Sequence, residues 1–276
     1  MGISARVADR ISSQLKRYQA ILADAHARDV SESDTVVIIV DILADVLGYK
    51  KYSEITTEYS IRGTYVDLAV KVGNDVRFLI EAKAIGSTLK DSHVKQAIDY
   101  GANNGIEWVV LTSGVKWQVY KVHFKQPIDK SLIFEFDVLQ ANPKNPQVIE
   151  CLGNLSREGF AQASMTSFFQ QRQITSKFSI AAMLLSEPML DKLRREIRRL
   201  SPGCKVEMDE LEAVMRADVL KRDVFDSDEA KQAADYIKKS GRAAERAKAR
   251  AAADEVPAAT VAIPKDAGVG IDQKAA

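Results

Sequence analysis

The stretch FLIEAKA, residues 78–84, decides the fold that the surrounding chain predicts. Its apolar residues are those of a buried strand, but it also carries Glu81 and Lys83. Side chains alternate between the two faces of a strand, so residues two positions apart project from the same face. An acid and a base therefore leave the end of one core strand together, and the rest of the sequence has to account for them.

Alternating and helical apolar patterns around this stretch predict a mixed α/β domain. One helix is expected within residues 30–51, where Ser31 and Asp34 form a capping pattern and Gly48 suits the helix end. A second helix is expected within residues 92–105. The expected strands are residues 55–61, 64–72, 76–84, 107–114, 116–124 and 131–139.

The second and third expected strands are joined by a tight turn at residues 73–75 and form a hairpin. If the apolar faces of both strands lie on the core, Asp67 emerges beside Glu81 and Lys83. Two carboxylates and an ammonium group suit a hard cation, because Mg²⁺ prefers oxygen ligands and keeps water and substrate phosphate beside one or two carboxylates. The metal lowers the pKa of its bound water, and the lysine orients or deprotonates that water.

Asp67 followed by Glu81-Ala82-Lys83 on the next strand resembles the D…(D/E)xK signature of the PD-(D/E)xK nuclease superfamily. The following helix adds Gln96 and Tyr100, which match the QxxxY element of a restriction-type branch and share one helical face. Over roughly residues 30–125 the chain also resembles the N-terminal nuclease domain of the motor (R) subunit of type I restriction enzymes. The resemblance implies a restriction-endonuclease-like core, a mixed β-sheet flanked by helices.

The resemblance also implies a metal site, made by the carboxylates of Asp67 and Glu81 and the carbonyl of Ala82. Its cofactor would be Mg²⁺, with Mn²⁺ as a substitute. A glutamate near the start of the preceding helix often joins such sites, and Glu32 holds the matching position. The attraction of a carboxylate to a helix N-terminus explains Glu32 equally well. Glu58, on the strand beside Asp67, is a further candidate.

Catalytic roles follow from the same resemblance. Gln96 is expected to contact phosphate or to steady Lys83, and the alternative is an ordinary surface glutamine. For Tyr100 the alternative to a catalytic role is that its ring packs against neighbours while its hydroxyl binds water. Lys83 and Gln96 are also the residues of this site that we expect to contact DNA. The full catalytic set that the resemblance implies is Asp67, Glu81, Lys83, Gln96 and Tyr100.

The expected function is Mg²⁺-dependent hydrolysis of DNA phosphodiester bonds by an endonuclease of the restriction, or phage-defence, type. Two features depart from the family pattern: Val66 replaces a proline, and the sequence has no GxxxxGK[ST] loop, so we expect no ATP motor on this chain. The expected partners are DNA, with RNA as the alternative substrate, and either a second copy or a separate motor or specificity subunit. The alternative function is a non-cleaving module on the same fold that binds nucleic acid or a partner.

Composition predicts four segments along the chain. An N-terminal helix is expected within residues 1–30, and the nuclease-like domain within residues 31–140. The loop QANPKNPQ, residues 140–147, marks a boundary to a mainly helical region over residues 141–240. An alanine-rich flexible tail is expected for residues 241–276, entered through a frayed helix.

Basic residues gather in two places beyond the boundary. Arg194, Arg195 and Arg198 crowd one expected helix. A second group leads into the tail. Contacts with DNA phosphates suit both groups, and a solvated helix face is the alternative for both. The second group consists of Lys238, Lys239, Arg242, Arg246, Lys248 and Arg250.

The overall composition is that of an ordinary globular protein, with a net charge of +1. Cys151 and Cys204 are far apart, so neither a disulfide framework nor a zinc site is expected. The sequence has no apolar run of membrane-spanning length and no apolar signal segment at its start. We therefore expect a cytoplasmic protein without membrane contact.

Overall fold

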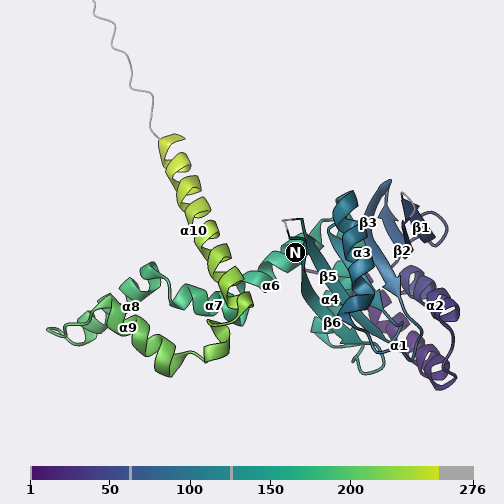
Figure 1. Cartoon of the computed structure of the whole chain (residues 1–276), viewed down its shortest axis with the longest axis horizontal. Coiled ribbons are helices and arrows are strands. Elements are labelled where there is room, and N and C mark those ends of the chain that lie inside the picture. Colours follow the sequence, from purple (N-terminus) through teal and green to yellow (C-terminus); the bar gives the residue numbers. More distant parts are fainter. Residues whose placement is uncertain (1, 62–63, 125–126, 255–276) are drawn as a thin grey trace, which may run out of the picture. The chain divides into compact units, whose positions relative to one another are not determined.

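A computed structural model describes residues 2–61, 64–124 and 127–254 (Figure 1). The chain divides into two units, Met1–Gln173 and Ile174–Ala276, and each is described by itself. The first unit is a mixed α/β structure, as expected. It is built on a six-stranded sheet whose strands follow one another in chain order.

The sheet is antiparallel except where β3 pairs with β4 in parallel through the crossover helix α3 (Asp91–Asn104). All six expected strands are present, and the first two have the expected bounds. The strands are β1 (Ile55–Ile61), β2 (Thr64–Val72), β3 (Asp75–Ala82), β4 (Trp108–Thr112), β5 (Lys116–His123) and β6 (Asp129–Asp137).

The expected hairpin between β2 and β3 is confirmed. Its turn needs a residue with positive φ, and Gly73 supplies it with a φ of 66°. Leu68 lies opposite Ile80, and Ala69 lies opposite Leu79. This register places the apolar residues of the two strands in matching positions on the sheet.

One face of the sheet is covered by α1 (Ala5–Ala27) and α2 (Glu32–Asp45), together with helices that follow the sheet. Ser31 caps α2, since its hydroxyl accepts a hydrogen bond of 3.2 Å from the Asp34 N–H. Apolar side chains of both helices are buried with Leu68 and Ile80 of the sheet. The predicted capping pattern is therefore confirmed.

The opposite face is covered by α3. Val94 and Ala97 of this helix form a second core with Leu79 and Leu111 of the sheet. Leu79 lies two residues before Glu81 and so shares its face of β3, and this face is a core as well. Strand β3 is therefore buried on both sides over most of its length, and polar side chains are found only at its ends.

Helices α4 (Pro146–Leu155), α5 (Arg157–Ala161) and α6 (Ser164–Ile174) complete the first unit. The Arg157 Nε donates to both carboxylate oxygens of the buried Glu54, each at 2.9 Å. The Tyr49 hydroxyl donates to the Leu155 carbonyl at 2.9 Å. These contacts tie α4 and α5 to the sheet domain, so the boundary expected at residues 140–147 lies inside the first unit.

The expected separate helix at residues 1–30 also belongs to this unit. Its α1 side chains Ile11, Leu15 and Leu22 are almost fully buried in the main core. Among the described residues, no helix combines the length and the apolar character needed to cross a membrane.

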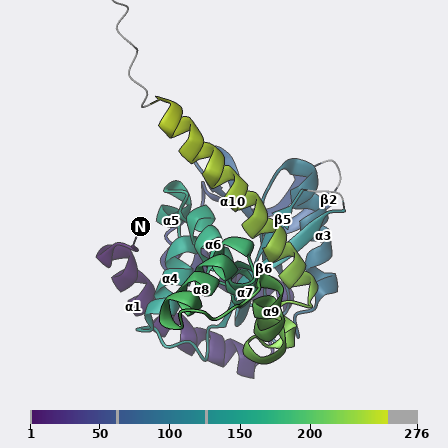
Figure 2. The same cartoon turned by 90° about the vertical axis from the view of Figure 1, so that its left-hand side faces the viewer.

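The second unit is helical over its described residues. Its long helix α10 packs against α7 through Ala230 and Ala233 and is drawn as one continuous rod (Figures 1 and 2). Helix α10 passes through Ser240-Gly241, where a frayed segment was expected, and residues 255–276 of the expected tail lie outside the described residues. The helices are α7 (Lys177–Leu184), α8 (Glu187–Leu200), α9 (Met208–Val214), a π-helical turn (Met215–Val219), a 3₁₀ turn (Arg222–Val224) and α10 (Asp228–Asp254).

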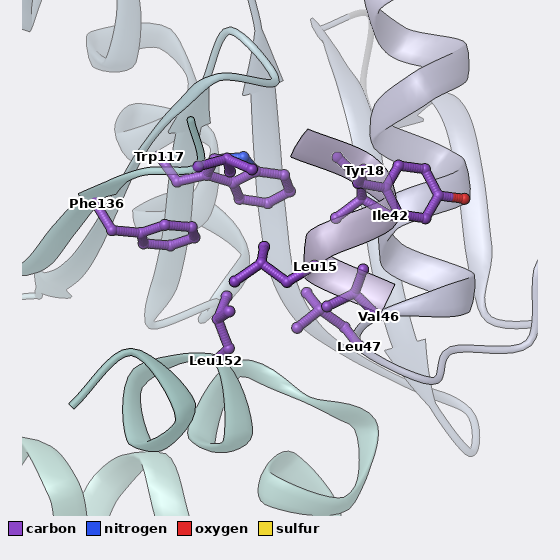
Figure 3. A pocket seen from close by; sticks show the side chains of 9 residues that line it. Leu15, Tyr18, Ile42, Val46, Leu47, Trp117, Phe136 and Leu152 are labelled. Carbon is purple, nitrogen blue, oxygen red and sulfur yellow. The ribbon is translucent and has the colours of Figure 1, made fainter. Parts of the chain in front are cut away.

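The main core contains a small apolar cavity of about 10 Å³ between α1, α2, α4 and the strands β5 and β6 (Figure 3). Leu15 and Leu152 point toward it from α1 and α4, and Trp117 and Phe136 line it from the sheet. Its apolar lining offers no hydrogen bonds to a water molecule, so we expect it to be dry.

Leu15→Ala tests whether α1 is an integral part of the core. The substitution enlarges an existing cavity and removes buried apolar surface, so we expect a loss of about 2–5 kcal/mol in the free energy of unfolding. Urea denaturation followed by circular dichroism measures this loss. Val37→Ala is the control, because Val37 is 58% exposed on α2 and should cost little. Equal losses in the two variants would contradict the placement of α1.

Candidate functional site

The candidate site lies where β2 and β3 separate. Their backbone pairing ends at Leu68 and Ile80. Beyond that point the Asp67 carboxylate replaces a backbone acceptor, because its Oδ2 accepts the Ala82 N–H at 2.7 Å. A hydrogen bond from a backbone N–H to a carboxylate is a strong one, so it fixes the Asp67 side chain at the end of β3.

Lys83, the first residue after β3, interacts with several oxygen atoms at this end of the sheet. Its Nζ donates to Glu81 Oε1 at 2.8 Å and to the Ala82 carbonyl at 2.6 Å. Glu32 Oε2 lies 3.7 Å from the same nitrogen. The Lys83 N–H donates to the Thr112 carbonyl of β4 at 2.8 Å, which holds the residue in position.

Glu32 reaches this site because α2 begins beside the end of β3. It is the first residue of α2, so its carboxylate also lies at the positive end of the helix dipole. Its side chain is half exposed, whereas that of Glu81 is only 12% exposed. Both explanations of Glu32 that the sequence offered are therefore compatible with its position.

The ionisable groups of the site influence one another strongly. Burial raises the pKa of Glu81; the negative charges of Asp67 and Glu32 add to this rise, and Lys83 opposes it. Burial acts to lower the pKa of Lys83, but its hydrogen bond to Glu81 and the nearby carboxylates outweigh burial and raise it. Lys83 is therefore an ammonium group at neutral pH in this arrangement, which suits orienting a water molecule better than deprotonating it.

The donor atoms at the site match a hard cation in chemical kind. Carboxylate oxygens of Glu81 and Glu32 and the Ala82 carbonyl oxygen all lie near the Lys83 ammonium nitrogen, which occupies the position between them. Among the described residues, no group of three or more His, Cys, Asp and Glu is arranged so that it could hold a metal ion. Since oxygen ligands are the ones that Mg²⁺ prefers, a divalent ion would have to exchange with the ammonium group.

Gln96 lies beside the site but not in it. Its Nε2 donates to the Tyr65 carbonyl at 2.9 Å, so it ties α3 to β2. In the described part of the chain it makes no hydrogen bond to Lys83, which was one of its expected partners. Its side chain is exposed, and a contact with substrate phosphate stays a prediction.

Tyr100 is buried, and its ring packs edge-on against Tyr59 with 6.3 Å between the ring centres. Its hydroxyl is buried and has no hydrogen-bond partner among the described residues. Burial also raises the pKa of the Tyr100 hydroxyl. No hydrogen bond joins Tyr100 to the carboxylates or to Lys83, so its contact with the site is indirect.

Glu58 is exposed on β1 between Thr57, which pairs with Leu68, and Tyr59, which pairs with Val66. This register would place it opposite Asp67, but Glu58 has a φ of 48°, and the strand pairing includes no partner for it. The sequence did not predict the Thr112 carbonyl as a support of the site. A parallel pairing of the strand ending at Thr112 with β3 would have indicated it.

The arginines of α8 were a second expected DNA contact, and they belong to the second unit. Arg194 and Arg195 both bind Asp191, at 2.7 and 2.5 Å. Arg198 donates to the Val206 carbonyl at 3.4 Å. Asp191 therefore offsets one of the two positive charges of Arg194 and Arg195, and the role of the three arginines toward DNA stays a prediction.

Tyr100→Phe removes a buried hydroxyl that has no partner. Because such a group carries a desolvation cost without a compensating hydrogen bond, we expect the variant to be as stable as the wild type or up to about 1–3 kcal/mol more stable. Tyr120→Phe is the matched control, since the Tyr120 hydroxyl donates to Gln118 Oε1 at 3.0 Å and its loss should cost about 1 kcal/mol. Thermal and urea unfolding measure both changes. A destabilised Tyr100→Phe variant would reveal a partner for the hydroxyl.

Glu81→Gln tests the electrostatics of the site. Because burial raises the pKa of Glu81, the folded state holds a proton there more tightly than the unfolded chain does. The stability that Glu81 contributes is complete below its ordinary pKa and is lost as the pH rises through the raised value. We therefore expect the stability of the wild type relative to Glu81→Gln to fall over a range of pH that begins at the ordinary glutamate pKa of about 4.3 and extends upward. Unfolding curves across this range measure it, with the exposed Glu135→Gln as control, and a relative stability that rises with pH would contradict it.

No family model, no curated protein and no solved structure matches this chain. The resemblance noted in the sequence therefore rests on the residues quoted for it. A function for the chain has to be inferred from the arrangement of Asp67, Glu81 and Lys83.

Proposed function

We propose that the chain is a Mg²⁺-dependent endonuclease of the restriction-endonuclease-like fold, which hydrolyses phosphodiester bonds in DNA for a restriction or phage-defence purpose. One observation carries the proposal: Asp67, Glu81, Lys83 and the Ala82 carbonyl meet at the end of β3, where the two covered faces of the sheet come to an end. Mn²⁺ would substitute for Mg²⁺.

The residues divide the work as follows. When bound, the divalent ion supplies positive charge to the substrate phosphate and lowers the pKa of a bound water. Glu81, the Ala82 carbonyl and Glu32 would hold it, together with Asp67, whose Oδ2 is fixed by the Ala82 N–H. Lys83 now donates to Glu81 Oε1 and to the Ala82 carbonyl. With those oxygens holding the ion, the Lys83 ammonium group would be free to donate to the attacking water or to a phosphate oxygen.

Cleavage of both strands of a duplex needs two such sites, which a second copy of the chain would provide. The sequence contains no GxxxxGK[ST] loop, so any ATP-driven motor, like a specificity subunit, would be a separate chain. RNA is the alternative substrate and belongs in the same assay.

A second function is favoured by the state of Lys83. Its ammonium group already neutralises the oxygens that would hold a metal, as it would in a module that binds nucleic acid or a partner without cutting. Such a module would bind DNA equally well with and without a divalent ion. The two functions therefore differ in their response to metal.

Calorimetric titration of Mg²⁺ and Mn²⁺, with and without DNA, combined with a plasmid-cleavage assay tests the proposal. We expect Asp67→Asn and Lys83→Gln to reduce cleavage by about 100-fold or more, because each removes a group that acts on the reacting atoms. Asp67→Asn should also weaken metal binding. The matched controls are Asp99→Asn and Lys95→Gln, which change the same charges on exposed positions of α3 and should leave cleavage unchanged.

Full cleavage by Lys83→Gln would reject the mechanism. DNA binding without metal dependence, and without cleavage in the presence of metal, would establish the non-cleaving module instead. Single-stranded and duplex DNA and RNA, digested side by side, identify the substrate. Tyr100→Phe in the same assay separates a catalytic role of that hydroxyl from a packing role of the ring.

A further inference from the structure

Beyond Ser240, the described side chains of helix α10 are exposed to solvent. Ala230 and Ala233, near its start, are buried against α7. Farther along, every side chain from Gly241 to Ala247 is exposed. A helical segment whose side chains are all exposed gains little from burial, so packing does not explain the sequence of residues 241–247.

This exposed part carries a strong positive charge. Residues 238–254 contain six Lys or Arg and two acidic residues, Glu245 and Asp254. None of the cations with described side chains has a carboxylate within ion-pair distance in the described part of the chain. We name these cations the α10 stripe: Lys238, Lys239, Arg242 and Arg246.

The unpaired state distinguishes the α10 stripe from other cations of the same unit. In α8, Arg195 binds Asp191 and Arg199 binds Glu196, each at 2.5 Å. Lys231, near the start of α10, binds Asp228 at 2.8 Å. Carboxylates of their own helices thus neutralise those cations, whereas the α10 stripe offers its charge to a partner.

The members of the stripe share one side of the helix. Lys238, Arg242 and Arg246 follow one another at intervals of four residues, and Lys239 lies three residues before Arg242. Four residues advance an α-helix by about 6 Å, so the charges form a row along the axis. Arg250 continues the same interval in the sequence.

We infer that the α10 stripe binds the phosphate backbone of nucleic acid without reading its sequence. A row of unpaired cations on an exposed helix complements a row of phosphates, and each contact releases condensed counterions. The inference concerns binding alone, but the choice of nucleic acid among polyanions rests on the proposed function.

The composition of the same helix argues against a lipid surface. A helix that lies on a membrane buries large apolar residues such as Leu, Phe or Trp in the headgroup region. From Gly241 to Asp254 the only apolar residue is alanine. The segment therefore has the charge for an anionic surface but no apolar face to insert into it.

A nonspecific contact of this kind would act together with the candidate site. A chain that holds DNA at a second place raises the effective concentration of DNA at the first. Loss of the stripe would then raise the DNA concentration needed for half-maximal cleavage without changing the rate at saturation.

The test follows binding of the full chain to a fluorescein-labelled duplex of mixed sequence at salt concentrations from about 50 to about 200 mM, a range over which phosphate contacts weaken strongly. EDTA is present, so metal-dependent cleavage plays no part. One variant replaces every member of the α10 stripe by glutamine. The matched control removes the same charge from paired cations of the same unit, by glutamine substitution of Lys177, Arg199, Arg216 and Lys231.

We expect the slope of log K against log salt to become shallower by about 0.9 for each phosphate that the protein no longer neutralises, and thus by about 3 to 4 in the stripe variant. The control variant should keep most of the wild-type slope. An unchanged slope in the stripe variant, or an equal change in the control, overturns the inference. Tighter binding of the wild type to phosphatidylserine vesicles than to the duplex, abolished in the stripe variant, overturns it in favour of a membrane surface.

Failure of this inference and failure of the proposed function give different results. If wild type never cleaves but shows the expected slope change, the proposed nuclease is wrong and the binding helix remains. If the wild type cleaves DNA but the stripe variant keeps the wild-type slope, the proposed nuclease stands and the inference about the α10 stripe is wrong.

Discussion

Burial of β3 on both faces is the constraint on which the rest of the structure depends. Helices α1 and α2 cover one face of the sheet and α3 covers the other, so a charged side chain in the middle of β3 would be buried without water. Charged side chains of β3 can reach water only at the ends of the strand, beyond the helices that cover it. Glu81 and Lys83 lie at one of these ends, with side chains 12% and 20% exposed.

The separation of β2 from β3 turns this end into a site. Two paired strands would use the Ala82 N–H in their ladder, but here it binds the Asp67 carboxylate. One hydrogen bond therefore both ends the pairing and fixes a side chain. The parallel neighbour β4 supplies the Thr112 carbonyl that holds Lys83. The site is thus built from backbone groups of the sheet as much as from its side chains, which gives it the rigidity that precise chemistry needs.

The sequence predicted the parts that depend on local patterns. Strand alternation and the turn at Gly73 gave β1 and β2 with their observed bounds, and spacing by two residues placed Glu81 with Lys83. The partner of Gln96 could not be predicted, because it depends on how α3 is rotated over the sheet. The extent of the first unit could not be predicted either, because the hydrogen bond between Glu54 and Arg157 joins residues that are far apart in the chain. The loop at residues 140–147 has the composition of a linker, and the tertiary contacts of the helices that follow it show that it lies within the first unit.

The position of Lys83 has a consequence for how the protein matures. An acidic cluster normally repels itself until an ion arrives, and many metal sites are therefore unfolded without their metal. Here the chain brings its own counter-ion, bonded to Glu81 and to the Ala82 carbonyl and close to Glu32. The single ammonium group offsets part of the charge of the Asp67, Glu81 and Glu32 carboxylates, so this end of the sheet depends less on an external ion for folding than a bare acidic cluster would.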